Sequence, residues 1–523
     1  MAPLPTSRNT IRRAARPHGF VRCQHGGLMV FTLFMIVAIA MMVGMAIDVV
    51  RNEVTRTKLQ NTLDRAILAA ADLDQTESPA DVVGDYFEKA GLSDFLVDVK
   101  VDEGLNFRTV EAESAAEIPT MFLDLVGIPS LTVPATGTAN ETITEVEISL
   151  VLDNSGSMNS NNRLNLLKDA AREFVDIVID EAATDNKVSI SIVPFATQVS
   201  AGPDLLQYYN VSDEHAYSHC ITFGSADFAS SSLSRSQPLQ RAGHFDIRTW
   251  DEPPRNIYLT CPTDSSRQIT PFAHDPDYLK ARIDQFWAGG NTSIDVATKW
   301  GLTLLDPGTR GVISDMTDTG TVHDDFDGRP YDFGEPQVLK VLVVMSDGQN
   351  TDQWILEDEY RSGPSPLYVE KDDPTEEFYR YTPTSSWFHE TDIDSWSQLG
   401  NLTIANELRN LTWPEVWASR SVANYALYTK QEAVGGDWRA YYNDAFTTIP
   451  ASAKNSRTSQ ICGAARQQGV TVYTIGMDTY GQGDATLLDC ASSDAYFFDV
   501  QATQIGDAFS AIARDINRLR LTH

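Results

Sequence analysis

The chain has 523 residues, of which 42% are hydrophobic, and its 72 acidic residues outnumber its 40 basic residues to give a formal net charge of −32. This charge argues against nucleic acid, or an anionic membrane surface, as the main partner of the bulk of the chain. The length exceeds what one simple hydrophobic core organises, so we expect two or three structural units.

The N-terminal segment departs from the acidic trend. Residues 1–26 contain no acid and five arginines, namely Arg8, Arg12, Arg13, Arg16 and Arg22. Residues 28–47, "LMVFTLFMIVAIAMMVGMAI", carry no charge, and this is about the length that crosses ~30 Å of hydrocarbon. We therefore predict a cytoplasmic basic N-terminus over 1–26 and a transmembrane helix over 27–50, with the rest of the chain translocated. The alternatives are a buried core helix and a cleaved signal peptide, whose apolar region is shorter.

The segment 51–145 is predicted to hold a stalk helix and a small α+β unit. Apolar residues recur at helical spacing from Val50 to Ile67 without a glycine or proline, so the membrane helix is expected to continue to about residue 73. A second helix follows in "SPADVVGDYFEKAGL", and "MFLDLVGI" is expected to be a short one. Three stretches read as strands: "FLVDVKVDE", "FRTVEAESAAE" and "LTVPATGTANETI".

From residue 146 to 523 strands and helices alternate, which predicts an α/β domain with a doubly wound, mostly parallel sheet. The expected strands are "EVEISLVL", "KVSISIVPF", "QVLKVLVVMSDG", "VTVYTIGM" and "AYFFDV". Residues 203–270 and 351–452 do not fit the alternation, and we interpret them as two insertions into this one domain. The second is too rich in tryptophan and tyrosine for a disordered linker. Its acidic part, 351–400, is either a solvated loop region or a recognition surface.

Cysteine usage is consistent with an exported domain. Cys23 precedes the predicted membrane helix, and four cysteines follow it, an even number that suits a compartment in which disulfides form. Chain order favours the pairs Cys220–Cys261 and Cys462–Cys490 among the three possible pairings. No C-x-x-C pair occurs, which argues against structural zinc.

Five oxygen-bearing side chains are expected to meet at one edge of the predicted sheet. Asp153, Ser155 and Ser157 follow the first strand in "DNSGSM", and Asp347 follows the strand "LKVLVVMS". Thr292 lies in the glycine-rich loop "AGGNTS". Sites in open parallel sheets form at the carboxyl ends of the strands. Two carboxylates and three hydroxyls suit Mg²⁺ or Mn²⁺ better than zinc.

Two other interpretations of these residues remain open. Ser155 or Ser157 could cap the following helix, since serine is a common N-cap. Asp153 could instead be the nucleophile of a metal-dependent phosphohydrolase, but such sites generally need a second acid two residues later, where Ser155 stands. No G-x-S-x-G elbow with a paired histidine is present, so no serine hydrolase is expected.

The D-x-S-x-S pattern, the later threonine and the later "SDG" resemble the von Willebrand factor type A domain over roughly residues 146–523. The resemblance implies a metal-ion-dependent adhesion site formed by Asp153, Ser155, Ser157, Thr292 and Asp347. In that family an acidic side chain of a protein partner completes the metal shell. The resemblance therefore implies a binding module and not an enzyme.

The N-terminal region resembles TadG-like proteins of the tight-adherence (Flp) pilus system. "AIDVVR" is close to the pattern AVDxxR, and "LQNTLDRAILAAA" is close to LQxxxDAAALAAA. The resemblance implies a single-pass protein of the bacterial inner membrane, with its bulk in the periplasm and with pilus or secretion components as partners. The alternative is an envelope scaffold or sensor that uses the same kind of domain outside pili.

Overall fold

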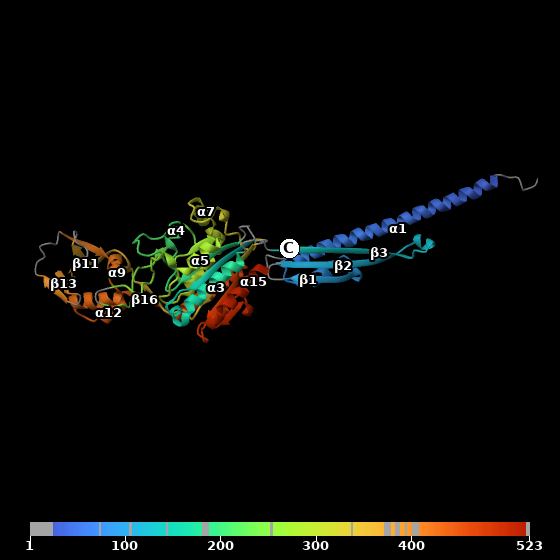
Figure 1. Ribbon diagram of the computed structural model, residues 1–523. Coiled ribbons are helices and arrows are strands. Elements are labelled where there is room, and N and C mark those ends of the chain that lie inside the picture. Colours follow the sequence, from blue (N-terminus) through green and yellow to red (C-terminus); the bar gives the residue numbers. More distant parts are fainter. Residues whose placement is uncertain are drawn as a thin grey trace, which may run out of the picture. The chain divides into compact units, whose positions relative to one another are not determined.

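The computed structural model describes residues 25–72, 75–103, 107–142, 145–179, 188–251, 255–335, 338–370, 378–381, 387–392, 395–399 and 407–518 (Figure 1). The predicted basic N-terminus and Cys23 lie outside the described residues. The chain divides into two compact units, the first over Met1–Glu103 with Arg108–Glu141 and the second over Gly104–Phe107 with Thr142–His523.

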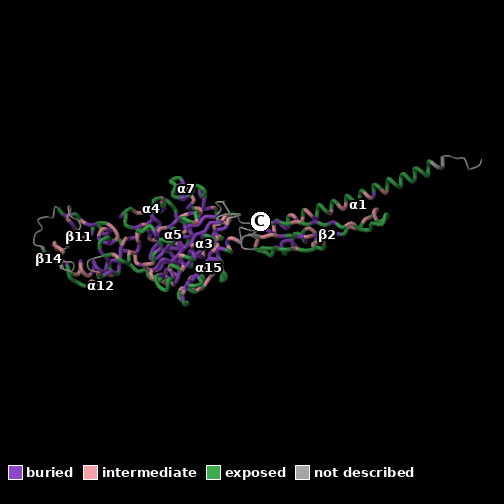
Figure 2. The backbone as a smooth tube through the Cα atoms, in the orientation of Figure 1, coloured by how far each residue is buried: buried purple, intermediate pink, exposed green. Residues whose placement is uncertain are grey.

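The first unit begins with one long helix, α1 (His25–Ala71), of 47 residues. Among the described residues, α1 is the one helix that is long and apolar enough to cross a membrane, with a mean hydropathy of 2.6 in its most apolar window. Its residues 28–40 are all exposed, as the green part of the helix in Figure 2 shows. The helix ends two residues before the predicted position, and no glycine or proline interrupts its second half.

The second half of α1 packs against a small α+β layer. This layer contains α2 (Pro79–Lys89), the 3₁₀ turns η2 (Ser93–Phe95) and η3 (Leu123–Val126), and an antiparallel sheet in the order β1-β2-β3. The strands are β1 (Leu96–Glu103), β2 (Phe107–Pro119) and β3 (Ser130–Thr142). Leu59, Leu63 and Ile67 of α1 are buried in the core that these elements share. The helical spacing seen in the sequence therefore marks the face of α1 that meets the sheet.

The second unit is built on a six-stranded mixed sheet in the order β18-β17-β9-β4-β5-β8. Its strands are β4 (Glu145–Asp153), β5 (Val188–Phe195), β8 (Thr270–Ala273), β9 (Val338–Ser346), β17 (Thr471–Met477) and β18 (Phe497–Val500). The five strands expected from the sequence are parallel, and β8 is an antiparallel edge strand that the sequence did not predict. The sheet is therefore mostly, but not wholly, parallel.

Both faces of this sheet are covered by helices. The inward side chains of one face pack on α3 (Arg163–Val178), α5 (Pro276–Asp284) and α15 (Ile505–Arg518). Those of the other face pack on α6 (Ile294–Leu305), α7 (Arg310–Asp318), α13 (Ala451–Gln467) and α14 (Asp484–Cys490). In β4, Leu150 and Leu152 belong to the first core and Val151 to the second, which explains why three apolar residues follow one another there. Short 3₁₀ turns complete this part: η4 (Gly156–Asn162), η7 (Pro307–Thr309), η8 (Asp324–Phe326), η11 (Asp494–Tyr496) and η12 (Ala502–Gln504).

The first stretch outside the alternation, 203–270, is mostly irregular. It contains α4 (Gly202–Leu206), η5 (Ser225–Ala229), η6 (Ser265–Arg267) and the two-residue strands β6 (Ile221–Thr222) and β7 (Gln240–Arg241). Phe223, Phe228 and Leu239 are buried in the same core as α6 and α13. This stretch is therefore packed onto the domain and not looped away from it.

The second stretch, 351–452, folds around tryptophans of its own. β10 (Gln353–Leu356) pairs with β16 (Phe446–Ile449), and five strands form an antiparallel sheet in the order β14-β13-β12-β11-β15. Those strands are β11 (Pro364–Glu370), β12 (Phe378–Tyr381), β13 (Trp387–Asp392), β14 (Ser395–Leu399) and β15 (Leu408–Thr412). The helices are α8 (Asp358–Arg361), α9 (Trp413–Ser419), α10 (Val422–Asn424), the π-helix η10 (Tyr425–Gln431), α11 (Glu432–Val434) and α12 (Trp438–Asp444). In this core Trp413 and Trp417 are stacked, and Tyr425 packs edge-on against both rings.

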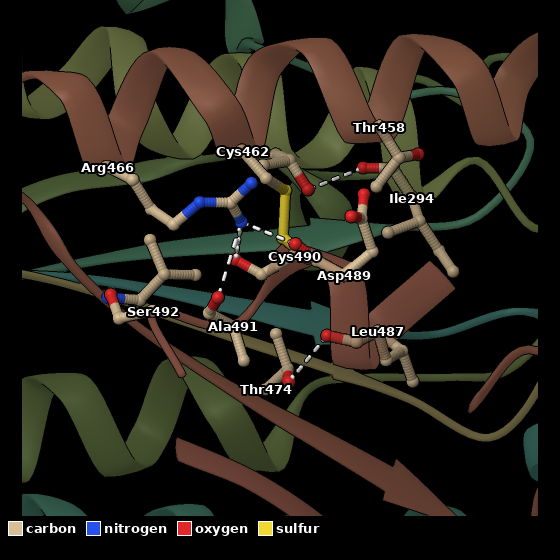
Figure 3. The surroundings of a disulfide bond; sticks show 12 residues. Ile294, Thr458, Cys462, Arg466, Thr474, Leu487, Asp489, Cys490, Ala491 and Ser492 are labelled. Atoms are coloured by element: carbon tan, nitrogen blue, oxygen red, sulfur yellow. Dashed lines mark hydrogen bonds between the residues drawn. A yellow bond between two sulfur atoms is a disulfide. The ribbon is translucent and has the colours of Figure 1, made fainter. Parts of the chain in front are cut away.

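Two disulfide bonds cross-link parts of the second unit. Cys220 is joined to Cys261, with 6.2 Å between their Cα atoms, and Cys462 is joined to Cys490, with 4.9 Å between theirs. These are the two pairs that chain order favours. Figure 3 shows the second bond, which links α13 to the end of α14 beside Arg466 and Leu487.

Candidate metal centre

The candidate centre forms where two neighbouring parallel strands end. β4 and β9 run in register, with Leu152 opposite Met345, so that Asp153 ends one strand beside Ser346 at the end of the other. The Ser346 hydroxyl donates a hydrogen bond to Oδ2 of Asp153 at 2.6 Å. Asp347 is the next residue of the chain, and the two carboxylates therefore share one edge of the sheet.

The loop after β4 carries the two serines to the same edge. The backbone N–H of Ser155 donates to Oδ1 of Asp153 at 2.7 Å. The Oγ atoms of Ser155 and Ser157 are 3.0 Å apart, and the Ser157 hydroxyl donates to Oδ1 of Asp347 at 2.7 Å. Four of the five residues singled out from the sequence are thus joined by a continuous series of hydrogen bonds.

The fifth residue, Thr292, lies in a loop that is fastened to both neighbours. The N–H of Gly156 donates to the carbonyl oxygen of Gly290 at 2.9 Å, and the N–H of Thr351 donates to that of Thr292 at 3.1 Å. Gly290 has a φ of +89°, a left-handed conformation that glycine adopts without strain. Thr292 is buried between the loops that follow β4 and β9.

Both carboxylates are withdrawn from water. Asp153 is fully buried and Asp347 is 5% exposed. Burial, and then the negative charge of Asp347, raise the pKa of Asp153 to about 7. Burial also raises the pKa of Asp347, against the opposing effects of its contacts with Ser157 and Arg163. A cation at this edge would favour the ionised form of both groups.

The spacing of the oxygens suits a small octahedral ion. In a Mg²⁺ shell with metal–oxygen bonds of about 2.0–2.1 Å, neighbouring ligand oxygens lie roughly 2.9 Å apart. The distances of 3.0 Å between Ser155 Oγ and Ser157 Oγ, and of 2.7 Å between Ser157 Oγ and Asp347 Oδ1, are close to that value. The donor set, with carboxylate and hydroxyl oxygens only, also fits a hard divalent cation.

Two charged residues at this edge were not found from the sequence. Arg163, the first residue of α3, donates from Nη1 to Asp347 at 2.8 Å and from Nε to Asp478 at 3.1 Å. Two features of the sequence could have indicated these residues. A cation at the start of a helix opposes the helix dipole and needs an acidic partner, and Asp478 directly follows β17, a third strand of the same sheet.

Behind the centre, Lys454 of α13 holds the Thr292 loop in place. Its fully buried Nζ donates to the carbonyl oxygens of Thr292 at 2.7 Å and Thr351 at 2.8 Å, and to Ser293 Oγ at 2.6 Å. Asp295 lies 3.9 Å from the same nitrogen and supplies the balancing charge. Sequence analysis missed this lysine because it is about 160 residues from the loop that it supports.

A cleft of about 710 Å³ opens beside the centre. It is lined by Gly156, Gly290 and Asn291, by residues of the first insertion and by Trp354. Two cation–π pairs line it, Arg267 over Trp287 at 3.9 Å and Arg248 over Trp354 at 4.8 Å. Basic and aromatic side chains therefore line the cleft, together with the carboxylate of Asp264.

The N-terminal segment matches a family model. Residues 26–73 match the Tad model, described as "Putative Flp pilus-assembly TadE/G-like". This segment is therefore similar to that family. The matched residues coincide with helix α1, including the apolar run and the motif "AIDVVR" that follows it. No curated protein matches the chain.

The solved structures that the chain resembles include a von Willebrand factor domain of a pilus tip protein. The vWF domain of the type V pili tip protein Mfa5 from Porphyromonas gingivalis is 14% identical, with a TM-score of 0.31 and coverage of 72% of this chain and 96% of that one. The adhesive tip pilin GBS104 from Group B Streptococcus agalactiae is 12% identical, with a TM-score of 0.32 and coverage of 71% and 100%. Proximal thread matrix protein 1 of the mussel byssus, with a zinc-occupied MIDAS motif, is 13% identical, with a TM-score of 0.25 and coverage of 72% and 46%.

Proposed function

We propose that the second unit is a protein-binding module that depends on a divalent cation. Asp153, Ser155, Ser157, Thr292 and Asp347 would hold Mg²⁺ or Mn²⁺, and a carboxylate from a protein partner would complete the shell. The observation that carries the proposal is the series of hydrogen bonds that joins Asp153, both serines and Asp347 at one edge of the sheet. When bound, the ion would offer a coordination position to the carboxylate of an acidic side chain.

Charge at the edge explains why metal and partner would bind together. Asp153 and Asp347 contribute two negative charges, and Arg163 already pairs with one of them. The protein alone therefore offers the ion little excess negative charge, and Mg²⁺ retains its waters readily. A partner carboxylate adds the missing charge, so metal and partner should each strengthen the binding of the other.

The setting of the module follows from the N-terminal segment. We propose that α1 anchors the chain in the bacterial inner membrane, with residues 1–26 in the cytoplasm and the second unit in the periplasm. The match of residues 26–73 to a pilus-assembly family supports a role in assembling or anchoring a tight-adherence pilus. The partner would then be a pilus or secretion component that presents an acidic residue, with the neighbouring basic and aromatic cleft receiving the residues around it.

The binding function is favoured over a metal-dependent phosphohydrolase. In the latter, Asp153 would attack the substrate and a second acid would stand two residues later, where this chain has Ser155. Asp153 is also fully buried. A scaffold or sensor role outside pili would use the same metal centre and differs only in its partner.

The partner is testable by capture with the full chain in detergent. Wild type and Asp347→Ala would be immobilised and exposed to envelope extract of the source cells, with Mg²⁺ or with a chelator. The proposal predicts pilus or secretion components that are retained by wild type in Mg²⁺ and lost in the other three conditions. Proteins retained equally in all four would contradict the module, and Mg²⁺-dependent partners unrelated to pili would support the scaffold or sensor role.

A further inference from the structure

The turn between β2 and β3 is bonded to helix α1 through one buried carboxylate. Asp48 accepts the backbone N–H groups of Met121 at 3.1 Å, Phe122 at 2.7 Å and Leu123 at 3.0 Å. These are free donors at the start of the 3₁₀ turn η3, so Asp48 caps that turn from a different part of the chain. Arg51, one turn later on α1, lies 4.0 Å from the same carboxylate.

Packing reinforces this contact. Gly44 lies one helical turn before Asp48, and a Cβ at Gly44 would lie 2.3 Å from the ring of Phe122. Within residues 28–50, Gly44 and Asp48 are the only buried residues. The turn therefore covers only the surface around Gly44 and Asp48 in this stretch of the helix. Glycine is required at position 44 because a Cβ there would clash with the ring of Phe122.

The position of that spot on α1 is informative. The uncharged run of residues 28–47 is about 30 Å long in a helix, which matches the hydrocarbon thickness of a bilayer. Asp48 is the first charged residue after the run. A turn bonded to Asp48 and packed on Gly44 therefore lies where the helix would leave the hydrocarbon.

The outer surface of the turn is apolar. Met121, Leu125, Val126 and Ile128 are 64%, 69%, 51% and 42% exposed, and Asp124 is the one charged residue between 121 and 128. The turn is ordered by its own hydrogen bonds, including Gly127 N–H to Asp124 O at 3.0 Å and Ile128 N–H to Leu123 O at 3.1 Å. Apolar side chains held in this way at the bilayer boundary would enter the headgroup and acyl region.

We propose that the β2–β3 turn, residues 120–129, inserts its apolar side chains into the surface of the same bilayer that α1 spans. Asp48 is the positioning residue, because its carboxylate joins the turn to the helix at the depth of the interface. The first unit would then contact the membrane at two points. This inference rests on the proposed membrane anchoring of α1.

The test places nitroxide labels on the full chain in nanodiscs of phosphatidylethanolamine and phosphatidylglycerol. Single cysteines would be introduced in a Cys23→Ser background at Leu125 in the turn, at Val37 in the helix and at Val97, an exposed apolar residue of β1. Collision with oxygen reports lipid, and collision with a soluble nickel chelate reports water. We expect the Val37 and Leu125 labels to favour oxygen and the Val97 label to favour nickel.

Each other result contradicts the inference in a distinguishable way. A Leu125 label in water with a Val37 label in lipid leaves the anchor intact and refutes insertion of the turn, whereas a Val37 label in water refutes the anchor and the insertion together. A Leu125 label shielded from both reagents, with spin–spin broadening between chains, would mean that a second copy covers the turn and would refute insertion.

A second pair of variants tests the role of Asp48. Adding Asp48→Ala should move the Leu125 label towards water, because the turn loses its bond to the helix. Asp85→Ala, on the exposed side of α2, should leave the label in lipid, and equal behaviour of the two variants would refute the positioning role of Asp48.

Discussion

Arg163 places a permanent positive charge where a divalent cation is proposed to bind. Its guanidinium lies 2.8 Å from Oδ2 of Asp347, whereas Ser157 bonds the other oxygen of the same carboxylate. One side of Asp347 thus faces the proposed ion and the other faces a fixed cation. The arginine balances charge at this edge of the sheet and would compete electrostatically with the proposed metal.

Replacing this arginine should separate the two effects. Arg163→Gln is expected to tighten Mg²⁺ binding roughly 3- to 10-fold, because a repelling charge is removed, and to lower metal-free stability by about 3 kcal/mol, because two buried carboxylates lose their partner. Calorimetry and chemical unfolding measure the two quantities. Arg172→Gln, at a half-exposed position of the same helix paired with Asp169 and Asp284, is the matched control and should change neither much. Weaker Mg²⁺ binding by Arg163→Gln would contradict competition.

At the scale of residues, the sequence identifies site residues that directly follow a strand, and it does not identify site residues that a docked helix brings in. Asp153, Ser155, Ser157 and Asp347 could be grouped because neighbouring parallel strands end at one edge, and the structure brings these four together. Arg163 meets Asp347 across 184 residues of chain. Such a contact depends on helix docking, which strand periodicity does not describe.

At the scale of elements, four of the five predicted strands of the large sheet are buried on both faces, and the fifth, β18, is half-buried. β4, β5, β9 and β17 are rich in apolar residues that are buried on both faces, which is typical of central parallel strands. β8 was missed because it has four residues and contains Pro271, and both features are typical of a short edge strand. The antiparallel sheet of the second insertion was missed because its strands are short and mix polar with aromatic residues.

The disulfide between α13 and α14 should stabilise the second unit. It closes a loop with a sequence separation of 28 residues, which corresponds to about 3–4 kcal/mol in the chain-entropy model. Both cysteines are fully buried in the core, and Arg466 donates to the carbonyl oxygen of Cys490 at 3.0 Å (Figure 3). Cys462→Ala with Cys490→Ala should therefore unfold at lower urea concentration than wild type. An unchanged midpoint in oxidised samples would contradict a stabilising role for this bond.

At the scale of the whole molecule, three buried or half-buried histidines should make the free energy of unfolding depend on pH. Burial, and then the charge of Arg241, lower the pKa of His215 to about 4, and burial also lowers the pKa of His219 and His244. Below about pH 6.5 the unfolded chain binds protons that these imidazoles do not. Stability therefore falls as the pH drops from about 6.5 towards 4. The raised pKa of Asp153 acts in the opposite direction, so the histidine effect must be isolated by difference.

His215→Asn provides that difference. Nδ1 of His215 accepts the N–H of Tyr217 at 3.2 Å, and the asparagine oxygen can accept the same bond without titrating. Free energies of unfolding from urea titrations at several pH values should fall less steeply in the variant, by roughly 1–3 kcal/mol over the interval. Parallel curves for wild type and variant would show that His215 is not the group responsible.

The central claim is that Asp153 and its neighbours bind a divalent cation, and Mg²⁺ titration of the full chain by calorimetry tests it most directly. Mg²⁺ suits this test because a second group able to bind metal, His274 with His323 and Asp325, offers imidazoles that favour softer ions. Asp153→Ala is compared with wild type and with Asp264→Ala, an acid on the wall of the cleft. The account predicts one Mg²⁺ bound by wild type and by Asp264→Ala and none by Asp153→Ala. All three proteins should be folded without metal, with Asp264→Ala melting slightly lower because its carboxylate caps η6. Equal binding by Asp153→Ala and wild type would contradict the account.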